Sequence, residues 1–414
     1  MKKIASIALA SGILTLCGAP AALAQSAQAV EHSGNVFHIA ACSHGVGRGV
    51  ARCHAHLVTD SRGAAHALTR DGRGHLGAAP NAPKPTYVVP AQVRAAYNIT
   101  GAGSPSTTVA IVDAYGYPNA EADLANFRAQ FGLGPCTTAN GCLRIVNQGG
   151  GTSIPYPSNT GWDIEQAADL DTVSTMCPGC KILLVESSSA NLNALGAAVR
   201  TAASMGAHVI SNSYGGGEIG SNPFESAYNF PGIAVTASTG DSGYGAQFPA
   251  TSPHVIAVGG TTLNMRDLTR QSETVWNGAG SGCSAVYAEP TWQTPSHANM
   301  ANNTLCSMRM EADVSADADP NTGVVFYMNI PPYAPGFYIV GGTSISNQII
   351  AGIYGERGDA VNYASGIYIH SSALFDITSG TNAPPSCGAT YFCVAGKGYD
   401  GPTGLGTPNG DTAF

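Results

Sequence analysis

The sequence contains few charged side chains. Asp, Glu, Lys and Arg make up 11% of its 414 residues, whereas about 25% is typical of soluble domains. The net charge is −8 and no stretch concentrates basic residues, which argues against nucleic acid as a partner. Sparse ionisable groups also limit self-repulsion when carboxylates become protonated, so the composition suits an acidic environment. The length allows one large core with a small appendage.

Long apolar runs are also lacking. The apolar stretch that begins at Ile4 is shorter than the roughly 20 residues that span a membrane. Two lysines precede it, and Ala22-Leu23-Ala24 follows it as a small-residue cleavage site, so residues 1–24 are predicted to be a secretory signal peptide. We therefore expect a secreted, extracellular protein without a membrane anchor; a periplasmic location is the alternative.

The cysteines give no sign of a zinc site or an unpaired thiol. Ten remain after signal cleavage, and an even number in an oxidising compartment favours disulfides. No second CxxC motif accompanies Cys177-Pro-Gly-Cys180 to complete a zinc site. Closeness along the chain predicts five local disulfides: Cys42–Cys53, Cys136–Cys142, Cys177–Cys180, Cys283–Cys306 and Cys387–Cys393.

Residues 25–85 differ in composition from the rest of the chain. They hold seven of the 11 histidines, have few long apolar runs and end in a proline-rich stretch. We interpret them as a short N-terminal pro-segment and linker, followed by one domain over residues 86–414.

From about Thr86, short buried strands alternate with amphipathic helices. This pattern predicts an α/β fold with a mostly parallel sheet flanked by helices, and catalytic groups at the carboxyl ends of the strands. The strand candidates are Thr108–Ala114, Ile182–Glu186, His208–Ser213, Ile233–Ser238, Val255–Gly259 and Phe337–Val340, and the helical stretches lie near Ala120–Phe131, Trp162–Thr175, Asn191–Met205 and Ser346–Tyr354.

The most informative motif is Gly341-Gly342-Thr343-Ser344, between an apolar run and a helix-like stretch. A serine at such a strand-to-helix turn exposes its hydroxyl beside the positive helix N-terminus, which favours a developing oxyanion. No histidine motif is placed to activate Ser344, so its base must be another group.

Two carboxylic acids can supply that base. Glu165 and Asp169 are four residues apart in a helix-like stretch, so they share a face, whereas Asp171 points elsewhere. Adjacent carboxylates in a cleft raise each other's pKa and can hold one proton between them. Such a pair could serve as a general base in mild acid, where histidine is protonated; a solvated helix face is the alternative.

Asp241 lies in Gly240-Asp241-Ser242-Gly243, directly after a strand candidate. A protonated Asp241 could donate a hydrogen bond to an oxyanion in acid. Gly-Asp-Ser-Gly also marks the nucleophile of trypsin-like enzymes, which would make Ser242 the catalyst. However, Tyr244 and Gly245 replace the Gly-Pro expected there, and the α/β pattern contradicts a β-barrel.

Taken in order, these motifs resemble the sedolisins, the serine-carboxyl peptidases with a subtilisin-like fold. The matching segments are Glu165-x-x-x-Asp169, Cys177-Pro178-Gly179-Cys180-Lys181-Ile182, Gly240-Asp241-Ser242-Gly243 and Gly342-Thr343-Ser344. The resemblance covers about residue 86 to the C-terminus. It implies Ser344 as nucleophile, Glu165 as its base, Asp169 as the partner of Glu165, and Asp241 as oxyanion stabiliser.

The resemblance also implies one structural Ca²⁺ near the C-terminus. Carboxylates of Asp376 and Asp400, carbonyl groups of Ile377, Gly396 and Gly398, and water would form its oxygen shell. A turn-rich loop without an ion is the alternative reading of the same residues.

Two positions need separate comment. Gln348 stands where the family usually has proline, which would preset the first helical turn. Asp113 ends a strand candidate but has no partner histidine, so we interpret it as structural.

These features predict a secreted, acid-acting, monomeric peptidase for protein or peptide substrates. An extended substrate would pair with backbone near Ser213 and Gly215. An endopeptidase is expected; a tripeptidyl-peptidase of the same family, a hydrolase that uses Ser242 or a histidine, and a non-catalytic binding protein are the alternatives.

Overall fold

The computed structural model describes residues 28–43, 47–78, 86–294, 306–382, 387 and 390–414. The predicted signal peptide and the proline-rich end of the predicted linker, residues 79–85, lie outside the described residues. Among the described helices, none is both long and apolar enough to cross a membrane.

The central sheet has the predicted, mostly parallel character. Its strand order is β15-β14-β12-β10-β7-β9-β8, with β18 paired to β14, and only the β14/β15 pair is antiparallel. The strands are β7 (Thr108–Ala114), β8 (Leu143–Asn147), β9 (Lys181–Ser187), β10 (Val209–Asn212), β12 (Ala234–Ser238), β14 (Ile256–Arg266), β15 (Thr269–Val275) and β18 (Val314–Asp317).

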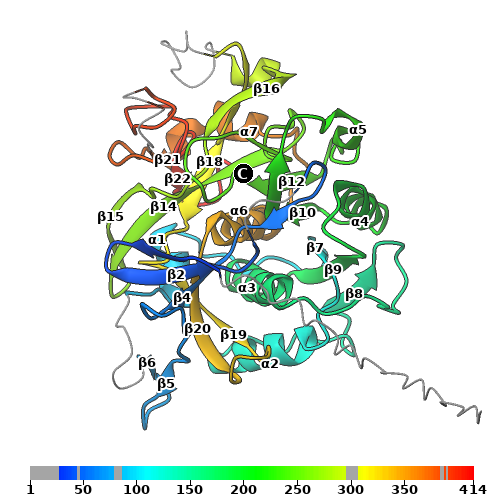
Figure 1. Cartoon of the computed structure of the whole chain (residues 1–414), viewed down its shortest axis with the longest axis vertical. Helices are drawn as coiled ribbons and strands as arrows, with labels where there is room; N and C mark the ends of the chain where they lie inside the picture. Colours follow the sequence, from blue (N-terminus) through cyan, green and yellow to red (C-terminus); the bar gives the residue numbers. More distant parts are fainter. Residues whose placement is uncertain (1–27, 44–46, 79–85, 295–305, 383–386, 388–389) are drawn as a thin grey trace, which may run out of the picture.

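Helices cover the sheet, and two of them lie side by side at the centre of the molecule: α3 (Thr160–Met176) and α6 (Thr343–Arg357) (Figure 1). Helix α4 (Leu192–Ser204) packs against β7, β9 and β10. Strand β7 is buried from Val109 to Ala114, so both of its faces are covered. The other helices are α1 (Pro90–Ala96), α2 (Ala120–Gln130), α5 (Asn222–Glu225) and α7 (Ser365–Ile369), with 3₁₀ turns at Thr291–Gln293 and Ser371–Ala373.

A second, antiparallel sheet joins the N-terminal segment to the rest of the fold. Its order is β1-β2-β4-β20-β19, with β1 (Val30–Ser33), β2 (Val36–Ala40), β4 (His56–Thr59), β20 (Gly336–Gly341) and β19 (Val324–Met328). The strand predicted at Phe337–Val340 is therefore present as β20, but it does not lie in the parallel sheet, because its partners are β4 and β19. Figure 1 shows the blue N-terminal strands beside β20.

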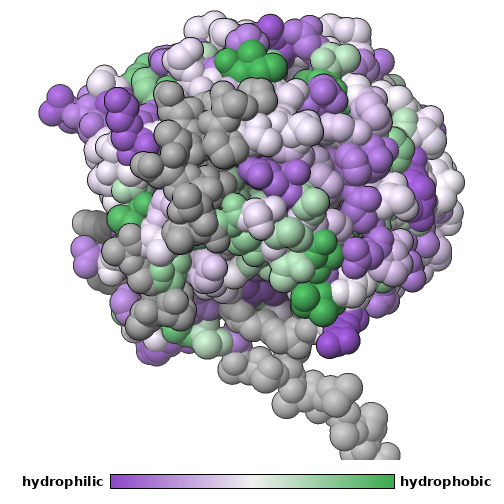
Figure 2. Space-filling view, turned by 90° about the horizontal axis from the view of Figure 1, so that it is seen from above, coloured by the Kyte–Doolittle hydropathy of each residue, from purple (hydrophilic) through white to green (hydrophobic). Residues whose placement is uncertain are grey.

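Short strand groups complete the architecture. They are β3 (Arg52–Cys53), β11 (Tyr214–Gly217) and β13 (Gln247–Phe248); β16 (Gly282–Ala288) with β17 (Met308–Glu311); β21 (Leu374–Phe375) with β22 (Thr407–Pro408); and β5 (Thr69–Arg70) with β6 (Leu76–Gly77). All five predicted disulfides are present. On the face in Figure 2, hydrophobic residues form separated spots among polar ones.

Candidate active site

Ser344 lies where β20 passes into α6. Strand β20 ends at Gly341, and Gly342 precedes the helix with a φ of 105°, a conformation that favours glycine. A Cβ atom at Gly342 would stand 1.9 Å from the carbonyl oxygen of His54. The predicted strand-to-helix turn is therefore present, and both its conformation and its neighbour require glycine.

Helix α3 carries the two predicted carboxylic acids into the interior. Its N-cap, Asn159, accepts a hydrogen bond from the backbone nitrogen of Trp162 at 3.3 Å. Glu165 and Asp169 are completely buried, as is nearly all of the helix. Asp171 points instead to β19, where it accepts a hydrogen bond from the backbone of Tyr327. The alternative of a solvated acidic face is excluded by this burial.

The buried acids form one electrostatic cluster that includes an unpredicted member. Burial, followed by the neighbouring charge of Asp113, raises the pKa of Glu165 well above its usual range. Burial and then the charge of Glu165 likewise raise the pKa of Asp169. Asp113, at the end of β7, pairs in register with Glu186 of β9, and burial raises the pKa of Asp113 to about 8. Such a cluster shares protons among its members at neutral pH.

Gln348 provides a hydrogen-bond donor to this cluster. From the second turn of α6 its Nε2 atom donates to Asp169 Oδ2 and to Ser213 Oγ, the latter at 2.9 Å. The bond to Asp169 favours the charged carboxylate and opposes the effect of burial on its pKa. A proline at this position could make no such bond. Because α6 begins at Thr343, residue 348 lies in its second turn and not in the first, so the expected constraint on the first turn does not apply here.

Asp241 is an acceptor in this structure, not a donor. Its Oδ1 atom accepts hydrogen bonds from Thr343 N at 2.8 Å and Thr343 Oγ1 at 2.7 Å, and its Oδ2 atom lies 3.2 Å from His56 Nε2. Burial would raise the pKa of Asp241, but the hydrogen bond and charge of His56 outweigh it and bring that pKa to about 2. The predicted protonated donor is thus held ionised by the N-terminal segment.

The expected nucleophile, Ser344, and its expected base, Glu165, are close but form no well-aligned hydrogen bond. Ser344 Oγ donates to the carbonyl oxygen of Ser213 at 3.2 Å. Its proximity lowers the pKa of Glu165 against the larger effect of burial, yet neither carboxylate oxygen of Glu165 has a well-formed hydrogen bond within the described chain. The structure therefore brings Ser344, Glu165, Asp169 and Asp241 together in a latent arrangement.

The rival nucleophile Ser242 has a different environment. It is exposed, and Arg52 Nη2 donates a hydrogen bond to its Oγ at 2.7 Å. An arginine can take no proton from a serine. Two histidines of the predicted domain lie in other contacts: His208 Nδ1 accepts from the backbone of Thr108, and His254 pairs with Glu225. His370 is exposed, and His297 lies outside the described residues.

The two predicted substrate-binding residues lie at a strand edge that is already occupied. The carbonyl oxygen of Ser213 accepts a hydrogen bond from His54 N at 3.2 Å, and Gly215 in β11 pairs with Arg52 in β3. The occupant is the chain's own N-terminal segment, in an extended conformation.

Four of the five predicted calcium residues come together: Asp376, Gly396, Gly398 and Asp400. Gly398 N donates to the carboxylate of Asp376, and Gly396 N donates to Asp400 Oδ2 at 3.2 Å. Burial, with a smaller effect from the charge of Asp376, raises the pKa of Asp400 to about 7. Two carboxylates from separate segments that repel each other fit the donor set of a hard cation.

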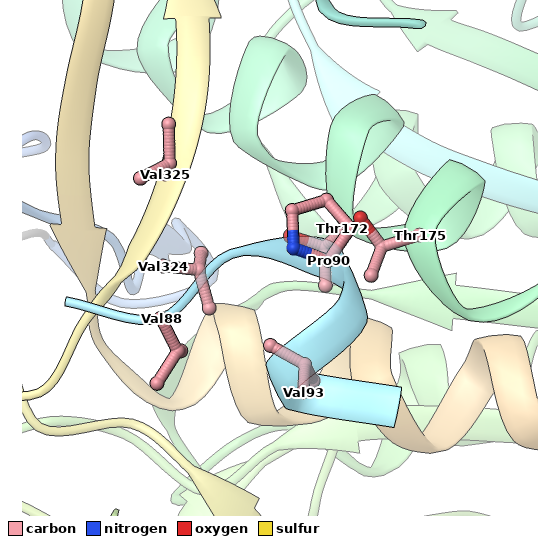
Figure 3. A pocket seen from close by; sticks show the side chains of 7 residues that line it. All are labelled: Val88, Pro90, Val93, Thr172, Thr175, Val324 and Val325. Carbon is pink, nitrogen blue, oxygen red and sulfur yellow. The ribbon is translucent and has the colours of Figure 1, made fainter. Parts of the chain in front are cut away.

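A small pocket elsewhere has no part in this site. It lies between α1, α3 and β19 and has mostly aliphatic walls (Figure 3). Its lining residues are Val88, Pro90, Val93, Thr172, Thr175, Val324 and Val325.

Comparison with known proteins places these features in one family. The sequence pattern of the subtilase family matches residues 154–362. Kumamolisin from Bacillus sp. (strain MN-32) is 30% identical over 83% of this chain and 66% of its own length, and sedolisin from Pseudomonas sp. (strain 101) is 26% identical over 86% and 64%. A structure of Pseudomonas sedolisin complexed with two molecules of pseudo-iodotyrostatin superposes with a TM-score of 0.65 and 25% identity, over 80% of this chain and 97% of that one.

The chain spans slightly less than two thirds of the length of these two curated relatives. Sequence reasoning missed two residues of the site. The sequence marks Asp113 as a strand end and Gln348 as the position of a usual proline, but no local pattern shows that either acts on the carboxylate pair. In each case the missing information was a contact between segments far apart in the sequence.

Proposed function

The chain belongs to the sedolisin branch of the subtilase family, and from this membership and the geometry of the site we propose that it is a serine-carboxyl peptidase that hydrolyses peptide bonds in acid. The observation that carries the proposal is the buried pair Glu165 and Asp169 on α3, facing Ser344 at the start of α6. A non-catalytic binding protein would have no need to bury this set of acids, which is costly unless they hold protons.

In the proposed reaction Ser344 Oγ attacks the peptide carbonyl while its proton passes to Glu165. Asp169 shares the proton and the negative charge of the pair with Glu165 and fixes the position of Glu165. Gln348 in turn orients Asp169 through a hydrogen bond. The oxyanion would receive hydrogen bonds from Ser344 N and from Asp241 once that carboxyl is protonated. Glu165 then gives its proton to the leaving amine, and water releases the acyl group by the same steps in reverse.

The extent of the groove supports an endopeptidase. The segment that occupies it continues past Arg52: Ala51 N donates to Ala190 O at 2.8 Å, and Val50 forms a bridge with Asn191. At least five residues therefore fit on the side that precedes the position of Ser344. A tripeptidyl-peptidase needs a barrier after the third of these positions, and this path has none among the described residues.

Other parts of the proposal concern the setting of the enzyme. We propose secretion, with residues 1–24 as signal peptide, residues 25–85 as a pro-segment, and a monomer that acts on protein or peptide substrates. Asp376 and Asp400, with the carbonyl groups of Ile377, Gly396 and Gly398, would hold one Ca²⁺ that braces the C-terminal loop.

The test compares Ser344→Ala with Ser242→Ala, its matched control from the rival motif, at pH 4 on a denatured protein. Cleavage should be lost in Ser344→Ala and kept in Ser242→Ala. Cleavage that survives in Ser344→Ala would refute the proposal, and so would an inactive wild type whose N-terminal segment has been removed and whose fold is intact.

A further inference from the structure

Strands β1, β2 and β4 of the second sheet bring a glutamate and two histidines together, and we propose that Glu31, His38 and His56 bind one Zn²⁺ ion. One carboxylate oxygen of Glu31 and one ring nitrogen of each histidine lie within 4.8 Å of one another. The proposal goes beyond the peptidase activity, because it assigns a metal site to the N-terminal segment and requires no catalysis.

The pairing of the strands explains why these three side chains meet. Glu31 in β1 lies directly opposite His38 in β2. His56 in β4 lies opposite Ala40, which is two residues along β2 from His38. Because successive side chains of a strand point to opposite faces, residues two apart share a face. All three side chains therefore leave the same face of the sheet, at neighbouring positions.

The two histidine rings face each other through their Nδ1 atoms. His38 Nδ1 lies 2.9 Å from His56 Nδ1, and the rings meet edge to face at an angle of 75°. Two nitrogens bound to one tetrahedral Zn²⁺ at about 2.0 Å stand about 3.3 Å apart. The rings would therefore have to separate by only a few tenths of an ångström. An ion between them would take the place of the one hydrogen that these two nitrogens can share.

Asp241 holds His56 in the orientation that a metal ligand requires. His56 Nε2 lies 3.2 Å from Asp241 Oδ2, and Thr343 donates two hydrogen bonds to the other carboxylate oxygen. A histidine that donates from Nε2 can present the lone pair of Nδ1 to a metal. Metal-bound histidines almost always donate their second nitrogen in this way, which fixes the tautomer and strengthens the bond to the metal. The cluster thus has an outer partner as well as three ligands.

The chemistry of the ligands favours Zn²⁺ over the cation proposed for the C-terminal loop. Imidazole nitrogen suits Zn²⁺, whereas Ca²⁺ takes about six to eight oxygen ligands. His38 and His56 are buried, with the Trp276 ring against His56, and Glu31 is half-buried. Two nitrogens, one carboxylate and a water that enters beside Glu31 would complete the four-coordinate shell that Zn²⁺ prefers.

An ion at this position would cross-link strands of the N-terminal segment. The segment contributes Val36 and Val58 to a small apolar cluster, and its disulfide, Cys42–Cys53, lies beyond the end of β2. A metal that binds only the folded arrangement adds to the stability of that arrangement. Because the outer partner Asp241 belongs to the predicted domain, zinc binding and the seating of the segment on that domain should strengthen each other.

The test measures zinc binding by isothermal titration calorimetry to the Ser344→Ala chain without residues 1–24, freed of metal and held near neutral pH. It should bind one Zn²⁺ and gain melting temperature, and Co²⁺ in its place should show the visible absorption of a four-coordinate ion. His38→Ala and Glu31→Gln should each weaken binding at least tenfold. His32→Ala is the matched control, since His32 is the exposed neighbour of Glu31 on the other face of β1, and it should bind zinc as before. Glu31→Gln keeps the size of a half-buried side chain, so it decides the question if His38→Ala fails to fold.

A second pair of variants tests the outer partner. Asp241→Asn should weaken zinc binding about 10- to 100-fold, the usual effect of removing a group that orients a metal ligand. Asp171→Asn changes an equally buried acid that is directed at β19, and it should leave the affinity unchanged.

The outcomes are independent of the proposed function, because the chain that is titrated lacks the nucleophile. A folded chain that binds no zinc, or that binds it equally well after Glu31→Gln and His38→Ala, overturns the proposal. Unchanged affinity in Asp241→Asn would overturn coordination through His56 Nδ1. None of these results bears on cleavage by Ser344, which the comparison of Ser344→Ala with Ser242→Ala decides.

Discussion

The buried acids around α3 and the buried histidines of the N-terminal strands meet in one site but respond to pH in opposite directions. Burial raises the pKa of Asp113 to about 8 and that of Glu186 to about 7. Burial lowers the pKa of His38 to about 3 and that of His54 to about 4. In both regions the neutral form is favoured because charge is poorly solvated in the interior.

The consequence for stability differs between the two regions. Acids that bind protons more tightly when folded contribute stability that is complete below their unfolded pKa of about 4 and is lost as pH rises toward 7 to 8. Histidines that bind protons less tightly when folded contribute stability that is complete above about pH 6.5 and is lost as pH falls toward 4 and 3. Acid should therefore strengthen the catalytic body and weaken the segment seated across it.

The largest expected effect comes from removing the base. Glu165→Gln should lower kcat/KM by about 10²- to 10⁴-fold, the usual contribution of a general base. Because it also removes one titrating acid from the cluster, it should raise the melting temperature at pH 8 more than at pH 4. Asp171→Asn, on the same helix but directed at β19, is the control and should keep most of the activity; equal losses in both variants would contradict the assignment.

The opposite pH responses of the two regions can be measured by hydrogen exchange in the Ser344→Ala variant. The exchange rates are corrected for the intrinsic effect of pH on exchange. Between pH 7 and pH 4, amide protection should fall in β2 and β4 and rise or hold in α3. The groups around the histidines are His32, His56 and Asp241 for His38, and Arg52, His56, Gln247 and Asp241 for His54. Protection that falls equally in all three elements would break the comparison.

Replacing Gln348 should lower activity less than replacing Glu165 does, and it should shift the pH–rate profile. Gln348→Ala removes a hydrogen bond to a charged group, so kcat should fall roughly tenfold. Without this donor the pKa of Asp169 should rise further, and the acid limb of the pH–rate profile should move to higher pH. Gln348→Met, of similar length but without the donor, should shift the limb in the same direction; an unchanged profile in both variants would show that the contact has no role in the reaction.

The smallest expected effect is the change in melting temperature when Ca²⁺ binds beside Asp400, a buried acid whose negative charge the cation would balance. Adding Ca²⁺ at pH 7 should raise the melting temperature by a few degrees, because an ion that binds only the folded state stabilises it. Asp376→Asn should remove most of this response. Asp411→Asn, another C-terminal acid outside the proposed ligand set and near Arg357, should keep it, and a response that survives in Asp376→Asn would place the ion elsewhere.

Local patterns in the sequence predicted much of the fold. The run at Thr108–Ala114 gave β7 with its observed bounds, since a strand buried on both faces is continuously apolar until Asp113. The sequence predicts the start of α6 near Ser346, whereas the helix begins at Thr343, because Gly-Gly-Thr-Ser has no helical periodicity and only the conformation of Gly342 marks the boundary.

At the site, the sequence could not predict which strands pair when they lie far apart in the chain. One partner of β20 is β4, about 280 residues earlier, in a segment whose composition predicts only a pro-segment and linker. For the same reason, the sequence could not place His54 beside Ser344 or His56 against Asp241. The motif residues are predictable because each lies in a recognisable local pattern. His54 and His56, which contact these residues from the N-terminal segment, lie in no such pattern.

The measurement that tests the account most directly is the pH–rate profile, on a denatured protein, of the enzyme from which residues 25–85 have been removed, so that His56 no longer contacts Asp241; Ser344→Ala is the blank. Carboxylic acids as base and oxyanion donor predict activity near their titration range, roughly pH 3–5, with little activity at pH 8. A maximum above neutrality would contradict the carboxylate mechanism.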